Sequence, residues 1–104
     1  MIAQVRTYTA NKGRLDEWVK LFNEQIAPIH EKYGVKVLAA FVNRPQNEFI
    51  WVRLFRDQKH LEEGIQTYLT SPERRALGDL PNQLLAKRDS RDVEDVFAPG
   101  ALPG

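Results

Sequence analysis

The stretch that decides the fold is residues 49–56, FIWVRLFR, near the middle of the chain. Consecutive side chains of a β-strand point to opposite faces of its sheet. One face of this predicted strand carries Phe49, Trp51, Arg53 and Phe55. The other face carries Ile50, Val52 and Leu54. Since both faces are apolar, we expect both to be covered in the folded protein.

A second strand is predicted over residues 35–42, VKVLAAFV. Regular alternation would place apolar residues on both of its faces as well: Val35, Val37, Ala39 and Phe41 on one, and Leu38, Ala40 and Val42 beside Lys36 on the other. Residues 43–48, NRPQNE, are turn-forming and separate this strand from residues 49–56. A short polar connection of this kind joins antiparallel strands in a hairpin. We therefore predict that the two strands pair antiparallel.

A long amphipathic helix is predicted between a first strand, residues 2–9, and this hairpin. Its large apolar residues recur every three or four positions: Leu15, Trp18, Val19, Phe22, Ile26, Ile29 and Tyr33. Pro28 lacks a backbone N–H and crowds the carbonyl four residues earlier, so we expect a kink or a break there. Gly34 is the predicted end of the helix.

A second helix is predicted to begin after Asp57, a residue type that caps helix N-termini. Ser71, Pro72 and Glu73 combine a capping hydroxyl, a proline suited to the first turn and an acid near the positive helix end. Another helix should therefore start at this point. Short helical pieces are predicted as far as about residue 88, followed by a last strand over residues 92–98.

The predicted order is strand, helix, strand, strand, helix, strand. It is the order of an α+β ferredoxin-like fold, a split βαβ sandwich with two helices on one face of a four-stranded antiparallel sheet. Residues 1–98 are expected to form one domain, and residues 99–104 a flexible C-terminal tail. Because the helices cover one sheet face, the simplest cover for the second apolar face is the sheet of another copy. We therefore expect a homodimer formed through the sheet face.

Composition narrows the possible chemistry. The chain has 15 Lys and Arg against 14 Asp and Glu, a net charge of +1, which gives no reason to expect nucleic acid as a partner. It has no cysteine and two histidines, so we expect no metal site and no thiol chemistry. No segment is long and apolar enough for membrane insertion, and residues 1–10 lack the apolar core of a signal peptide. A cytoplasmic location is expected.

Four short motifs stand out along the chain: Arg6-Thr7-Tyr8-Thr9, the following Gly13, Lys32-Tyr33-Gly34, and Ser71-Pro72-Glu73. They resemble motifs of the NIPSNAP family, which belongs to the dimeric α+β barrel superfamily. The resemblance extends over residues 2–98, with Lys12-Gly13 where the family often has Pro-Gly. It implies the same fold and the same dimer, and little about activity, because most bacterial relatives have no assigned reaction.

Five residues are candidates for ligand binding: Arg6, Trp51, Arg53, His30 and Tyr33. The two arginines stand where strands usually have aliphatic residues, and their donors suit a carboxylate, an enolate or a phenolate in a cavity between sheet and helices. His30 and Tyr33 follow Pro28, and a kink there would turn both toward the cavity mouth. The alternative is a structural role for each, as a core aromatic or as a satisfied polar group.

His60 and Tyr8 are the candidate catalytic residues, since both can exchange a proton. Gly64 lies one helical turn after His60, where the missing side chain would leave room for a ligand or let the helix approach the sheet. Trp51 and His60 are also similar to residues of heme-degrading monooxygenases of the same superfamily. The first strand lacks the asparagine of those enzymes, so no heme and no other cofactor is expected.

Two functions remain open at this point. The first is a NIPSNAP-like homodimer that binds a small organic molecule or acts as a scaffold. The alternative is a cofactor-independent monooxygenase or isomerase on a small aromatic or polyketide-like substrate, with His60 or Tyr8 handling the proton. The sequence does not decide whether the protein is an enzyme. A cavity lined by His60, Tyr8 and Arg6 would favour one.

Overall fold

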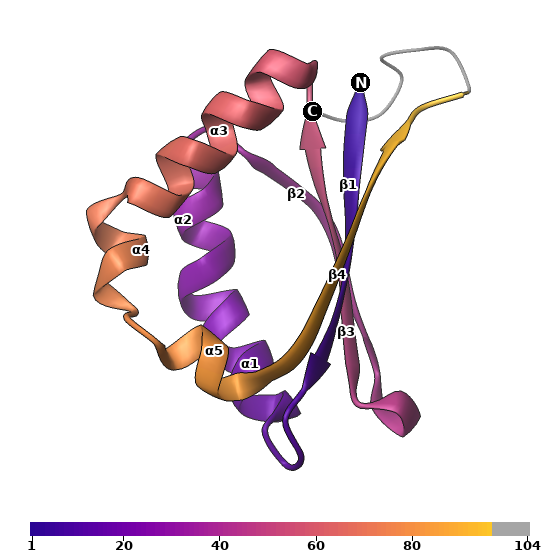
Figure 1. Cartoon of the computed structure of the whole chain (residues 1–104), viewed down its shortest axis with the longest axis vertical. Helices are drawn as coiled ribbons and strands as arrows, with labels where there is room; N and C mark the ends of the chain where they lie inside the picture. Colours follow the sequence, from indigo (N-terminus) through magenta and orange to yellow (C-terminus); the bar gives the residue numbers. More distant parts are fainter. Residues whose placement is uncertain (97–104) are drawn as a thin grey trace.

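Four strands form one antiparallel sheet in the computed structural model, which describes residues 1–96 (Figure 1). They are β1 (Ile2–Ala10), β2 (Lys36–Asn43), β3 (Glu48–Phe55) and β4 (Leu85–Glu94), in the order β2-β3-β1-β4. Each neighbouring pair is antiparallel. Together with the alternation of strands and helices, this order confirms the predicted α+β ferredoxin-like fold.

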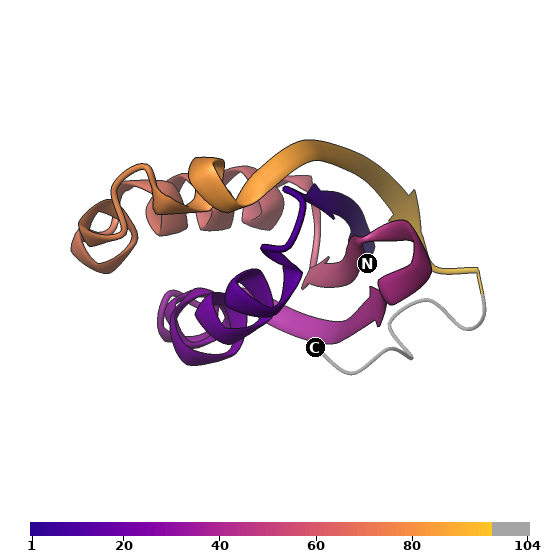
Figure 2. The same ribbon diagram turned by 90° about the horizontal axis from the view of Figure 1, so that it is seen from below.

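Figures 1 and 2 show the helices together on one face of this sheet. The first helical arm consists of α1 (Leu15–Leu21), η1 (Phe22–Ile26) and α2 (Ala27–Lys32). The second arm consists of α3 (Gln58–Thr70), α4 (Pro72–Ala76) and α5 (Leu80–Leu84). Within residues 1–96, no helix covers the opposite face, which we call the open face. No helix in this part of the chain is long and apolar enough to cross a membrane.

Both predicted helix starts are confirmed. The Asp57 carboxylate accepts a hydrogen bond from the backbone N–H of His60 at 2.8 Å, which caps α3. The Ser71 hydroxyl accepts one from the backbone N–H of Arg74 at 3.1 Å, and Pro72 occupies the first turn of α4. Each cap satisfies a donor that a helix terminus leaves unpaired.

Pro28 neither breaks nor ends the first helical arm. The π-helical turn η1 precedes it, and the backbone N–H of Ala27 donates to the carbonyl of Phe22, five residues earlier. The backbone dihedral angles of Leu21, Phe22, Ile26 and Ala27 all remain right-handed helical, so the arm is continuous. A wider turn of this kind accommodates a proline that cannot supply the usual hydrogen bond.

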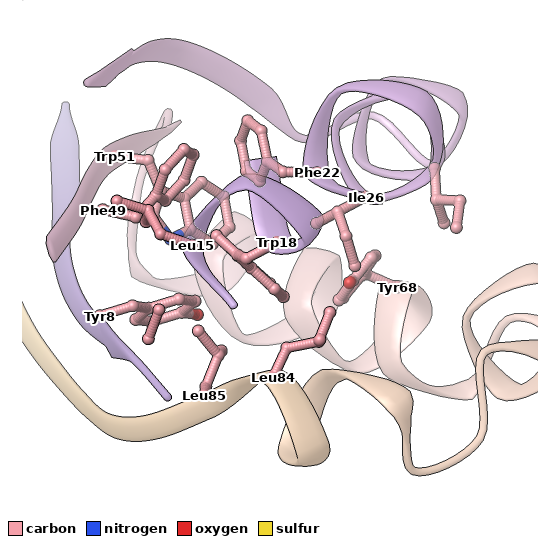
Figure 3. Packing of buried hydrophobic residues seen from close by; sticks show 12 residues of the cluster. Tyr8, Leu15, Trp18, Phe22, Ile26, Phe49, Trp51, Tyr68, Leu84 and Leu85 are labelled. Atoms are coloured by element: carbon pink, nitrogen blue, oxygen red, sulfur yellow. The ribbon is translucent and has the colours of Figure 1, made fainter. Parts of the chain in front are cut away.

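Aromatic rings of the first arm and of β3 form the centre of the core (Figure 3). The ring of Phe22 lies 5.1 Å from that of Trp51 and 4.6 Å from that of Phe49. Trp18 packs edge-on against Phe49 at 6.0 Å. Trp51 is 2% exposed, which confirms that the aromatic face of β3 is buried and shows that it faces the helices.

Strand β2 departs from regular alternation. Val37 lies opposite Arg53, but Ala39 lies opposite Val52, so Leu38 is an extra residue between the two pairs. Directly paired residues share a sheet face, and Val37 therefore faces the helices while Ala39 lies on the open face. The predicted grouping of these two residues on one face is wrong because a β-bulge reverses the alternation after it.

Strand β4 begins earlier than predicted. Residues 85–88, predicted as helical, are its first residues, and it ends at Glu94. The strand lies at the sheet edge and is exposed beyond Leu85, so it lacks the apolar alternation by which strands are recognised. Pairing with β1 determines its course instead. Residues 97 and 98 of the predicted strand, and the predicted tail of residues 99–104, lie outside the described residues.

Removing the central indole should destabilise the protein strongly. For Trp51→Ala we expect the free energy of unfolding to fall by about 3–5 kcal/mol, because the truncation leaves a cavity among packed rings. Chemical denaturation monitored by far-UV circular dichroism measures the change. The control is Val42→Ala, which shortens a side chain that is 41% exposed. Equal losses in the two variants would contradict a core role for Trp51.

Candidate functional site

A cavity of about 350 Å³ lies between the sheet and the helices. The sheet contributes five of the residues that line it: Arg6, Tyr8, Trp51, Arg53 and Arg88. The helices contribute, among others, Trp18, Ile26, His30, Tyr68 and Arg74. Its volume falls within the range of small-molecule pockets. The walls therefore combine aromatic rings with four arginines.

Sheet register explains why residues from three strands meet on the cavity floor. Arg6 lies opposite Trp51 on one side and opposite Ser90 on the other. Two residues along β1, Tyr8 lies opposite Arg88 of β4. Paired positions share a face, so antiparallel pairing brings together side chains that are up to about 80 residues apart in the sequence.

The side-chain carbonyl of Gln4 joins the two central arginines. Its Oε1 accepts hydrogen bonds from Arg53 Nε at 2.9 Å, from Arg53 Nη2 and from Arg6 Nη1 at 3.1 Å. Its amide Nε2 donates to Asp92 at 3.1 Å. Burial, followed by the charge of Arg6, lowers the pKa of Arg53 to about 10, below the usual value of a guanidinium. Arg53 is therefore still charged at neutral pH, and its main acceptor is a neutral group.

His30 is a neutral partner of Arg53 and not a free base. Its Nδ1 lies 2.8 Å from the carbonyl of Ile26, so Nδ1 carries the proton. The unprotonated Nε2 then accepts from Arg53 Nη1 at 3.1 Å. Burial and the nearby charge of Arg53 lower the pKa of His30 to about 3, although the hydrogen bond to Ile26 opposes this shift. The ring also stacks on Tyr68, with centroids 3.8 Å apart.

Tyr8 is the candidate proton handler that the structure places in the cavity. Its hydroxyl accepts a hydrogen bond from Arg6 Nε at 2.7 Å. The guanidinium carbons of Arg6 and Arg88 lie 5.2 and 5.6 Å from the centre of its ring. Two cations therefore surround this phenol.

His60 and Tyr33 lie outside this cavity. Imidazole Nδ1 of His60 accepts from the backbone N–H of Arg56 at 3.0 Å, and Nε2 lies 3.0 Å from the carbonyl of Gly34. The hydroxyl of Tyr33 donates to Glu73 at 2.7 Å and thereby connects the end of the first arm to α4. The Lys32 ammonium and this hydroxyl lower the pKa of Glu73 to about 2. Both predicted site residues thus make hydrogen bonds between elements of the fold.

Gly64 allows α3 to approach the sheet closely. A Cβ atom at this position would lie 3.1 Å from Val35 Cγ2 and 3.5 Å from the ring of Phe55. The space is therefore filled by core side chains. Of the two interpretations offered for this glycine, close approach of the helix is the one that these contacts support.

Sequence reasoning brought Arg6, Tyr8, Trp51, Arg53 and His30 forward, and all five line the cavity or its floor. It missed Gln4, Arg74 and Arg88 as members of the same site. Arg88 is not recognisable as a site residue from the sequence, because the predicted helix over residues 85–88 hides its pairing with Tyr8. The capping signal at Ser71 predicts where α4 begins, but it does not indicate that the side chain of Arg74 lines the cavity.

The polar groups that line the cavity are unsuited to binding a cation. Within residues 1–96, no group of three or more His, Cys, Asp or Glu residues is arranged to hold a metal ion. Guanidinium groups donate hydrogen bonds and accept none. The lining therefore matches a ligand with negative charge or with several acceptor atoms.

Comparison of the sequence with models of known protein families identifies the family of this chain. A family model described as NIPSNAP matches residues 3–92, which is most of the chain. The chain belongs to the NIPSNAP family. No curated protein sequence matches it significantly.

Solved structures agree with this membership. An uncharacterised NIPSNAP domain protein from Burkholderia xenovorans is 19% identical, with a TM-score of 0.84 over 95% of this chain and 99% of that one. A NIPSNAP family protein of unknown function from Agrobacterium tumefaciens is 15% identical, with a TM-score of 0.86 over 99% and 94% of the two chains. A putative antibiotic biosynthesis monooxygenase from Bacteroides thetaiotaomicron is 17% identical, with a TM-score of 0.75 over 95% and 91%. At these identities the likeness shows the fold.

The buried histidine makes stability depend on pH. Between pH 6.5 and about 3, the unfolded chain protonates His30 while the folded chain does not. The contribution of this group is therefore complete above pH 6.5 and decreases as the pH falls, with a slope approaching about 1.4 kcal/mol per pH unit. Denaturant unfolding at several pH values should show a shallower slope for His30→Gln than for the wild type.

The matched control for this experiment is His60→Gln. It removes the histidine that lies outside the cavity and leaves His30 in place. A His30→Gln chain with the same pH slope as the wild type would contradict a buried neutral imidazole.

Proposed function

We propose that this NIPSNAP family chain is a homodimeric protein that binds a small organic molecule in the cavity between sheet and helices. The observation that carries the proposal is the cavity itself. It measures about 350 Å³ and is lined by aromatic rings and convergent polar groups. An apolar pocket with a few fixed polar groups is the usual form of a small-molecule site. The cytoplasmic location expected from the sequence is part of the same proposal.

The lining is organised before any ligand binds. Arg53 is held by Gln4 and by His30, and His30 is held by Ile26. Trp51 lies edge-on to the rings of His30 and Tyr8, at 5.2 and 5.9 Å. Side chains fixed in this way lose little conformational freedom when a ligand enters, which favours binding.

The homodimer is supported by the open face. Phe41 of β2 is 63% exposed there, and Val93 of β4 is 43% exposed. The half-buried side chains of Ile50 and Val52 lie between them on β3. An apolar surface of this kind is commonly a protein interface.

The partner that fits this surface is a second copy of the same sheet. Lys87, Asp89 and Arg91 of β4 pair with Thr9, Thr7 and Val5, so they lie on the open face. Charges of both signs along one strand can pair with their counterparts across a two-fold axis. The apolar centre would then be enclosed between two sheets.

Solution mass and one charge substitution test the dimer. We expect light scattering to give twice the 12.0-kDa mass of the chain. Val52→Asp should shift the protein to a monomer, because it would place a carboxylate at the centre of the apolar interface. The control is Gln66→Glu, which adds a charge on the exposed side of α3. A wild-type monomer at micromolar concentration would refute the dimer.

Obstruction of the cavity tests ligand binding. Leu69 is 49% exposed and lines the cavity, so Leu69→Trp adds bulk to the lining at a tolerant helix position. We expect isothermal titration calorimetry with neutral and charged mono- and bicyclic aromatic compounds to find ligands whose affinity falls at least about tenfold in this variant. The control is Gln66→Trp, one turn earlier on an exposed position. If Leu69→Trp weakened none of the compounds, the binding proposal would fail.

The enzymatic alternative rests on Tyr8. Its hydroxyl is in the cavity and is polarised by Arg6 at 2.7 Å, which suits proton exchange with a bound molecule. His60, the other residue considered for this role, is separated from the cavity and bound to backbone atoms. A Tyr8→Phe chain that retains ligand affinity but loses turnover would distinguish an enzyme from a binding protein.

A further inference from the structure

The cavity holds a buried positive charge, Arg53, that forms no ion pair within residues 1–96. Arg53 is 4% exposed. Among residues 1–96, none of the ion pairs involves Arg6, Arg53, Arg74 or Arg88. A buried charge without a counter-ion is costly to the folded state. The cavity is therefore electrostatically incomplete.

The acidic residue nearest to this network does not contact the guanidinium groups. Asp92 is exposed at the sheet edge and accepts its hydrogen bond from the Gln4 amide. Arg53 and Arg6 share the neutral Oε1 atom of Gln4 instead. One amide oxygen thus serves two cations that lie close enough for Arg6 to oppose the charge on Arg53. An anion placed between them would relieve this repulsion.

Three further donors around the cavity lack acceptors. The indole Nε1 atoms of Trp18 and Trp51 and the Nε atom of Arg74 are buried without a hydrogen-bond partner within residues 1–96. All three residues line the cavity, and both indoles are 2% exposed. Buried donors are nearly always paired in proteins, and an indole N–H can only donate. A ligand that satisfies this lining must supply acceptor atoms.

The wall also carries aromatic rings, those of Tyr8, Trp18, Trp51 and Tyr68, beside aliphatic side chains such as Ile26 and Leu69. The rings of Tyr8 and Trp18 lie edge-on, 5.5 Å apart, and Figure 3 shows Trp18 and Tyr68 reaching the same interior space from different helical arms. A flat ring is the shape that such a wall accommodates best. A guanidinium group also matches a carboxylate better than a single-atom anion, because both are planar and can form two parallel hydrogen bonds.

From this combination we infer that the cavity binds an aromatic carboxylate, with its carboxylate against Arg6 and Arg53 and its ring among Trp18, Trp51 and Tyr68. The inference rests on the proposed function, since it names the class of molecule that the cavity takes. It assigns Arg53 and Arg6 as the residues that select charge. It assigns the aromatic residues as those that select shape.

A pair of ligands that differ in charge alone tests this inference. The probes are 2-naphthoate and 2-naphthamide, which share the ring system and differ in the carboxylate. We expect calorimetry to show at least about tenfold tighter binding of naphthoate. Raising the salt concentration should reduce the affinity for naphthoate only slightly, because salt screens buried charges less than exposed ones.

Variants of the arginines identify where the charge binds. Arg53→Gln should weaken naphthoate at least about tenfold and leave naphthamide nearly unchanged. The matched control is Arg75→Gln on α4, which removes the same charge from an exposed residue next to Arg74 and should leave both affinities within about twofold. If circular dichroism shows that Arg53→Gln does not fold, Arg6→Gln is the second variant. Arg6 is only half-buried, and its loss should again affect naphthoate alone.

The outcomes separate this inference from the binding proposal. Equal affinities for naphthoate and naphthamide, both lost in Leu69→Trp, would overturn the carboxylate assignment and leave small-molecule binding intact. Naphthoate binding that survives in both Arg53→Gln and Arg6→Gln would also overturn it. If neither probe bound and Leu69→Trp affected no compound of the wider panel, both proposals would fail.

Discussion

The two apolar faces of strand β3 are the constraint on which the rest of the fold depends, because burial of large apolar side chains is the dominant favourable contribution to folding. The face with Phe49 and Trp51 is covered by the first helical arm, whose rings pack against both residues. The face with Ile50 and Val52 has no such cover within residues 1–96. The architecture of one chain therefore satisfies half of this requirement, and the proposed second copy would satisfy the other half.

The same strand explains the candidate site. Arg53 follows Trp51 on the buried face, so the register that packs the indole also brings a guanidinium under the helices. A charge in that position needs acceptors, and Gln4 and His30 provide neutral ones. The network keeps Arg53 fixed and charged. The demands of stability and of the proposed binding are thus opposed here: an aliphatic residue would suit the core better, whereas an arginine would give the cavity the selectivity for anions that we propose.

The fold can be predicted from the sequence because the patterns that indicate its strands and helices are local. The caps at Asp57 and Ser71 depend on hydrogen bonds that span three residues. Only part of the site can be predicted in this way, because only some of its residues stand out in a local pattern. An arginine in an apolar strand is conspicuous in the sequence, so Arg53 was identified, whereas Arg88 belongs to a polar edge strand with no apolar pattern. His60 was conspicuous as a helix histidine, yet its partners, the backbone atoms of Arg56 and Gly34, carry no sequence signal.

The sequence by itself determined the order of strands and helices, the helix starts, and the presence of apolar residues on both faces of β3. These depend on residue type and on spacing within one segment. The tertiary structure decided which side chains meet in the cavity, and it separated His60 and Tyr33 from Arg6, Tyr8 and Arg53. That outcome depends on the register of strands far apart in the chain and on irregularities such as the bulge at Leu38. A shift of one residue moves every following side chain to the other face of a sheet, and only the packed structure fixes where such a shift occurs.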